Sequence, residues 1–148
     1  MYTAAVLNNI SSQLLRWIMR GTVNLESQGY NFGNNLPHHM TINMGKLDVS
    51  LNSKSILSCP ALMKVSELRF DHDLGICAAP VDEAIALRMD DSDPIVQIQT
   101  INEQPHITIC LKPGVRPVTS NELLAISNAE VVKLDEVYEL SGTIQEIH

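Results

Sequence analysis

The sequence is short of basic residues, with 10 Lys and Arg against 17 Asp and Glu and a net charge of −7. A protein that grips a long nucleic acid usually neutralises several phosphates with Lys and Arg side chains. No run of like charge offsets this shortage. The composition therefore argues against a long nucleic acid as partner and leaves a small charged ligand, held in one pocket, as the alternative.

Long apolar segments are also lacking. The longest, such as residues 76–81, are far too short to span a bilayer, and residues 1–9 lack the basic region and apolar block of a signal peptide. The three cysteines, Cys59, Cys77 and Cys110, are odd in number and lie in apolar surroundings, which favours reduced thiols over a disulfide framework. We therefore expect a cytoplasmic protein without a membrane partner.

The rest of the composition is that of a folded domain. A chain of 148 residues with 45% hydrophobic side chains can bury a sizeable core, and we expect a single domain over residues 1–148. Alternating apolar patterns predict seven or eight strands, one of them near residues 47–51, and a turn at residues 90–94. Helices are expected at residues 12–20 and at residues 121–127, the second capped by Ser120.

Two short predicted strands carry the same sequence pattern. HMTINM at His39–Met44 and HITICL at His106–Leu111 each carry His-x-Thr inside an apolar, alternating run. Because successive side chains of a strand point to opposite faces, each motif places an imidazole and a hydroxyl on the same face. If the two strands lie side by side, two histidines and two threonines line one groove.

That set of side chains suits the cleavage of a phosphodiester. One neutral imidazole accepts a proton from an attacking hydroxyl or water while a second, protonated imidazole donates a proton to the leaving oxygen. The ordinary pKa of histidine, about 6.5, makes both forms accessible near neutral pH, and threonine hydroxyls can donate to the non-bridging oxygens. The candidate catalytic residues are therefore His39, Thr41, His106 and Thr108, with the base and the acid left unassigned.

Two other interpretations compete with catalysis. A lone histidine on a strand is more often a structural hydrogen-bonding group, and His38, His39 and His106 are available as zinc ligands. We expect His38 and His39 on opposite faces of the strand, and no cysteine or carboxylate completes a familiar ligand spacing. We therefore expect no metal and no other cofactor, and the repetition of the motif favours catalysis.

The two tetrads, His39-Met40-Thr41-Ile42 and His106-Ile107-Thr108-Ile109, resemble the H-x-T-x signatures of the two-histidine phosphoesterase superfamily. The resemblance implies an α+β fold in which two antiparallel sheets form a concave cleft with helices packed outside. Within the superfamily the chain is most similar to the phage anti-CBASS nucleases. These enzymes degrade the cyclic di- and trinucleotide messengers of a bacterial antiviral system without a metal.

This resemblance implies a hydrolase that cleaves 3′–5′ bonds of a cyclic oligonucleotide in the host bacterial cytoplasm and so counteracts antiviral signalling. The pocket of these nucleases also uses an N-terminal tyrosine, a role that we expect Tyr2 to fill. Tyr30 and Phe32, in a polar loop near the first motif, are candidates to stack on a base.

Two alternative functions remain. One is an RNA-end phosphodiesterase that acts on 2′,3′-cyclic phosphate termini, as other branches of the superfamily do. The other is a protein that sequesters a cyclic nucleotide without turnover. The sequence leaves the oligomeric state open.

Overall fold

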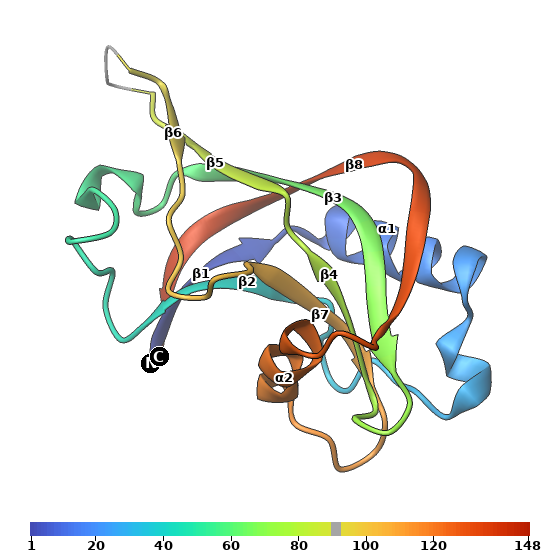
Figure 1. Ribbon diagram of the computed structural model, residues 1–148. Helices are drawn as coiled ribbons and strands as arrows, with labels where there is room; N and C mark the ends of the chain where they lie inside the picture. Colours follow the sequence, from blue (N-terminus) through green and yellow to red (C-terminus); the bar gives the residue numbers. More distant parts are fainter. Residues whose placement is uncertain (90–92) are drawn as a thin grey trace.

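The computed structural model describes residues 1–89 and 93–148, which form eight strands and two α-helices (Figure 1). The strands are β1 (Tyr2–Leu7), β2 (His39–Met44), β3 (Pro60–Asp71), β4 (Ile76–Pro80), β5 (Glu83–Leu87), β6 (Ile95–Gln97), β7 (His106–Leu111) and β8 (Glu130–Ile147). The helices are α1 (Asn9–Thr22) and α2 (Ser120–Ala125). The turn predicted at residues 90–94 falls largely outside the described residues.

All strand pairs in the described chain are antiparallel and join one sheet, in the order β4-β7-β2-β1-β8-β3-β5-β6. β3 pairs also with β4, between Phe70 and Cys77 among others, so that the six strands from β4 to β3 close into a barrel. β5 and β6 extend away from this ring (Figure 1). Helices and strands together agree with the α+β class, whereas the two separate sheets that we expected do not form.

The length of β3 explains this difference. Its first half, around Met63, pairs with β5 on one side and β8 on the other. Its register against β8 shifts between Val65 and Glu67, and its last residues pair with β4. A single irregular strand therefore belongs to both halves of the sheet and connects them, because a bulge bends a strand and increases its twist.

The apolar core lies behind the two motif strands. Met40 and Ile42 of β2 and Ile107 and Ile109 of β7 are fully buried, whereas the alternate histidine and threonine side chains are only partly buried. The two faces predicted from the alternation are therefore confirmed, and burial of these four aliphatic side chains anchors the polar face in front of them.

The helices differ in detail from the prediction. α1 begins earlier than expected because the Asn8 side chain accepts a hydrogen bond from the amide of Ser11 at 2.8 Å. α2 begins at Ser120 itself, and the hydroxyl of this fully buried residue bonds to a side chain of β7 instead of capping the helix. No strand forms at residues 47–51, where the Asp48 carboxylate accepts from the Ser50 amide in a turn. Neither helix in the described ranges is long and apolar enough to cross a membrane.

Candidate active site

The two motif strands are neighbours in the sheet. β2 pairs with β7 antiparallel, with Met40 opposite Ile107. Continuing that register by one residue in each direction places His39 beside Thr108 and Thr41 beside His106. The prediction that the motif strands lie side by side is therefore confirmed, and all four polar side chains line a single cavity of about 550 Å³.

The cavity is assembled from the start of β1, the two motif strands, the loop before β2, the loop before β7 and helix α2. Its lining residues are Tyr2, Asn35, Leu36, His38, His39, Thr41, Met44, Ile101, Asn102, His106, Thr108, Pro117, Val118 and Asn121. Among these described residues there is no Lys, Arg, Asp or Glu. A bound phosphate would therefore meet imidazole, hydroxyl and amide groups, and the imidazoles are the groups that can become positively charged.

His39 is held from three sides. Its Nε2 lies 3.2 Å from the Thr41 hydroxyl, its Nδ1 lies 2.8 Å from Nδ1 of His38, and the Tyr2 ring is tilted against it with 4.9 Å between ring centroids. Burial, together with the nearby His38 and His106, lowers the pKa of His39 to about 4. His39 is thus neutral at pH 7 and has a ring lone pair available to accept a proton.

His106 is oriented by the backbone. Its Nδ1 lies 2.9 Å from the carbonyl oxygen of Gln104. A carbonyl can only accept, so Nδ1 carries the hydrogen, and Nε2 is the nitrogen that gains or loses a proton. Burial lowers the pKa of His106, and the hydrogen bond to Gln104 opposes this effect.

Thr108 is fixed by helix α2. Its hydroxyl lies 2.6 Å from the hydroxyl of Ser120, at the first turn of the helix. The sequence predicts that Ser120 caps the helix, but in the structure its hydroxyl bonds to Thr108 instead. A serine at the start of a helix gives the same sequence pattern whether its hydroxyl caps the helix or bonds to another strand. The contact with Thr108 could therefore not be predicted from the sequence.

The position of His38 differs from the sequence prediction. We expected it on the face opposite to His39, yet both line the cavity, and their rings meet edge to face with 5.0 Å between centroids. The reason is that His38 lies just before the first residue of β2, so the alternation of a strand does not govern its direction. In the described chain no group of three or more His, Cys, Asp or Glu is arranged to hold a metal ion.

The structure does not support Tyr30 and Phe32 as stacking residues. Both are buried, at 3% and 7% exposure, and neither lines the cavity. The Tyr30 hydroxyl contacts Nδ1 of His72, while Phe32 packs under the guanidinium of Arg16. Their aromatic surface is covered by the fold itself, because the loop that carries them returns to the core. Tyr2, by contrast, lies in the cavity as expected.

A large part of the sequence matches a known protein family. The profile of a family described as the fungal tRNA ligase phosphodiesterase domain matches residues 50–146, about two thirds of the chain. The second motif lies inside the matched segment and the first precedes it. The match defines the class of the protein as a phosphoesterase. The chain belongs to the fungal tRNA ligase phosphodiesterase domain family.

Among solved structures, the chain is similar to a crystal structure described as that of a fungal RNA kinase, with a TM-score of 0.61 and 15% sequence identity. The similarity covers 97% of this chain and 44% of that one, so the chain spans less than half the length of the fungal protein. At this identity the likeness shows a shared fold. No curated protein matches the sequence.

Proposed function

We propose that this protein is a two-histidine phosphodiesterase that opens the 2′,3′-cyclic phosphate at the end of an RNA strand. The observation that carries the proposal is the meeting of two His-x-Thr motifs in one cavity, in a chain whose family is the phosphodiesterase domain of a tRNA ligase. A ligase acts at strand ends, and a cyclic phosphate is a phosphodiester that a strand end can carry.

The chemistry needs one base and one acid. His39 Nε2 takes a proton from water as the water oxygen bonds to phosphorus. The bond from phosphorus to one ribose oxygen breaks, and the Nε2–H of His106 gives its proton to that oxygen. The products are a phosphomonoester and a free ribose hydroxyl. The hydroxyls of Thr41 and Thr108 donate to the non-bridging oxygens, where negative charge accumulates.

The surroundings of the two imidazoles support this assignment. A general base must be unprotonated, and a pKa of about 4 keeps His39 neutral. A general acid must retain a proton, and the Gln104 carbonyl offsets part of the effect of burial on the pKa of His106. The negative charge of a bound phosphate raises the pKa of a neighbouring imidazole further, so the protonated acid forms in the complex.

The composition of the cavity favours a single phosphodiester. A terminal cyclic phosphate carries one negative charge, whereas a cyclic di- or trinucleotide carries two or three. The described lining residues include no Lys or Arg to balance additional charges. We therefore expect only the terminal nucleotide of the RNA to enter the cavity.

The family match favours this function over the others suggested by the sequence. The phage nuclease resemblance, with its cyclic messenger substrate and its role against antiviral signalling, finds no support in the comparisons, whereas the tRNA ligase phosphodiesterase domain points to RNA ends. Sequestration without turnover fits less well, because the family is described as a phosphodiesterase.

The direct test uses a synthetic oligoribonucleotide that ends in a 2′,3′-cyclic phosphate. We expect its ³¹P resonance to change from that of a cyclic diester to that of a monoester, while the same oligonucleotide with a 3′-phosphate stays unchanged. The His39→Ala/His106→Ala protein serves as the control for contaminating nucleases. No conversion by the unmodified protein, under conditions where it cuts cyclic di- or trinucleotides, would overturn the proposal.

A further inference from the structure

The two motif histidines share one feature, a hydrogen-bonding partner at Nδ1. For His106 the partner is the carbonyl oxygen of Gln104 at 2.9 Å. For His39 it is the Nδ1 atom of His38 at 2.8 Å. A backbone carbonyl before β7 thus performs for His106 what a side chain before β2 performs for His39.

The contact between His38 and His39 constrains where the protons lie. Two imidazole nitrogens at hydrogen-bond distance need one donor and one acceptor. If His39 Nδ1 carries the hydrogen, His39 Nε2 has a free lone pair. This lone pair accepts a hydrogen bond from the Thr41 hydroxyl at rest and a proton from water during the reaction. With the opposite tautomer, His39 Nε2 would carry a hydrogen and could not act as a base.

The segment that carries His38 is fixed by three successive carbonyl groups. The Leu36 carbonyl accepts from Nε and Nη2 of Arg16, at 2.9 and 2.6 Å, and the Pro37 carbonyl accepts from the Ser12 hydroxyl at 2.6 Å. The His38 carbonyl accepts from the amide of Leu7 at 2.9 Å. Helix α1 and the end of β1 therefore set the position of the backbone from which the His38 ring reaches His39.

We infer that His38 is a positioning residue: its Nδ1 accepts a hydrogen bond from His39 Nδ1–H, which orients the His39 ring and holds it in the tautomer that can act as a base. The catalytic consequence of this role rests on the proposed function. The tautomer of the His39 ring can be measured without a substrate. A base oriented by a third group is a general feature of nucleophile activation in enzymes.

Three substitutions of His38 distinguish the effect of its hydrogen bond from the effect of its ring volume. His38→Asn keeps an acceptor near the position of Nδ1, His38→Phe keeps a ring without a nitrogen, and His38→Ala removes both. His72 provides a matched control, because its Nδ1 also contacts a side chain, the Tyr30 hydroxyl at 3.1 Å, but it lies outside the cavity. His72→Phe is therefore expected to leave turnover unchanged.

Two readouts are measured on each variant: steady-state kinetics with the cyclic-phosphate oligoribonucleotide, and the ¹⁵N resonances of the His39 ring. We expect kcat and KM of the His38→Asn variant to stay near those of the unmodified protein. We expect His38→Phe and His38→Ala to lose about ten- to a hundredfold in kcat with little change in KM, as for other groups that orient a functional histidine. The His39 ring should be protonated at Nδ1 in the unmodified and Asn proteins and should shift toward the other tautomer in the Phe and Ala proteins.

Full activity of His38→Phe, loss of activity in His38→Asn equal to that in His38→Ala, or an unchanged His39 tautomer in all variants would overturn the role of His38. Should the Phe variant fail to fold, His38→Ala and His38→Asn give the same comparison. If the unmodified protein does not open the cyclic phosphate, the proposed function fails. The ¹⁵N measurement then decides on the positioning role alone.

Discussion

Met40 and Ile107 lie opposite each other across β2 and β7, and both are fully buried. Because the strands run antiparallel, an approximate twofold axis through this pair exchanges one His-x-Thr motif with the other. Each histidine therefore has the threonine of the other motif as its neighbour across the strands. The two imidazoles occupy similar positions, and the difference between base and acid comes from their surroundings, His38 on one side and the Gln104 carbonyl on the other.

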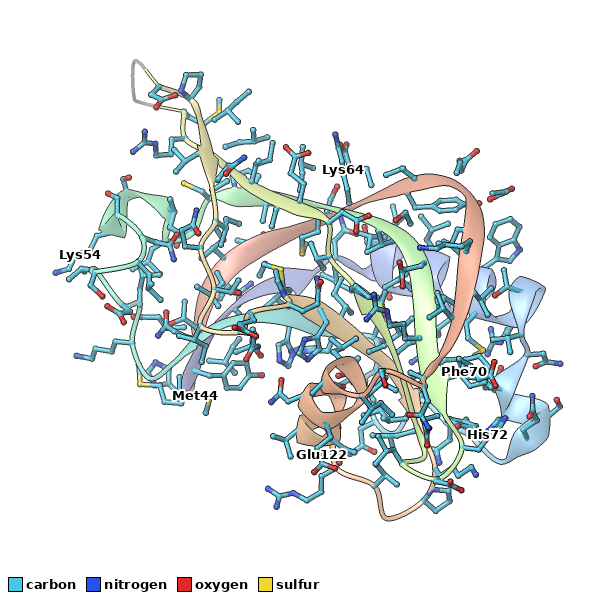
Figure 2. The ribbon with its side chains drawn as sticks, viewed as in Figure 1. Met44, Lys54, Lys64, Phe70, His72 and Glu122 are labelled. Atoms are coloured by element: carbon cyan, nitrogen blue, oxygen red, sulfur yellow. The ribbon has the colours of Figure 1, made fainter. Side chains whose placement is uncertain are left out.

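Replacement of either motif histidine by alanine should lower kcat for the cyclic-phosphate substrate by roughly 10²–10⁴-fold, the usual contribution of one acid or base. The double replacement should cost much less than the product of the two, because groups that work in one step are not additive. The control is His72→Ala, since Figure 2 shows His72 beside Phe70, well away from the cavity residue Met44. Independent, multiplicative losses would mean that the histidines act in separate steps.

Because of the Thr108–Ser120 contact, we expect substitutions at these two positions to affect stability and turnover differently. Thr108→Val leaves the hydroxyl of the fully buried Ser120 without the bond that it makes at 2.6 Å, which should lower the free energy of unfolding by about 1–3 kcal/mol. Thr108→Val/Ser120→Ala removes both polar groups and should recover most of that loss in urea titrations. Turnover should remain low in both proteins because the Thr108 hydroxyl is missing. Recovery of turnover in the double variant would show that the hydroxyl only supports the helix.

The lowered pKa of His39 predicts a loss of stability in mild acid. The unfolded chain takes up a proton near the ordinary pKa of 6.5, whereas the folded protein resists it until about pH 4, so the unfolded state binds more protons in this window. The contribution of His39 is fully present above pH 6.5 and falls by roughly 3 kcal/mol as the pH drops toward 4. The lowered pKa of His106 acts in the same direction.

Urea unfolding at several pH values between about 7 and 4 measures this effect. The variant His39→Gln cannot be protonated, so its stability should fall less steeply over that window than that of the unmodified protein. Carboxylates titrate in both proteins and cancel in the comparison. Parallel curves for the two proteins would show that His39 is not buried in its neutral form.

Excess EDTA should leave the initial rate of cyclic phosphate opening unchanged. The two imidazoles supply both proton transfers, and the threonine hydroxyls supply the stabilisation of charge that a metal would otherwise provide. The measurement is a rate before and after chelation, followed by addition of Mg²⁺, Mn²⁺ or Zn²⁺. Activity that disappears with EDTA and returns with one of these ions would exclude the metal-free mechanism.

The motif strands could be predicted from the sequence because they depend on local alternation. The bounds of β2 and β7 and the burial of Ile42 and Ile109 all agree with the expectation. The closure of the barrel could not be predicted, since it depends on a register shift within β3 that pairs one strand with three others.

The site residues likewise divide into those set by local alternation and those set by contacts between distant segments. His39 and Thr108 follow from the strand period, and both line the cavity. The position of His38 depends on a loop fixed by helix α1, and the burial of Tyr30 depends on contacts with residues about forty positions away, such as His72. Contacts of this kind between distant segments leave no periodic signal in the sequence.

The most direct test is a competition between two substrates in one reaction. A linear diadenylate that ends in a 2′,3′-cyclic phosphate and the 3′–5′ cyclic diadenylate are mixed in equal amounts with the protein, and chromatography follows both over time. We expect the linear molecule to be converted to its open monophosphate while the cyclic dinucleotide stays intact, because the cavity accepts one terminal phosphodiester. Faster linearisation of the cyclic dinucleotide, with the terminal cyclic phosphate unchanged, would contradict this expectation.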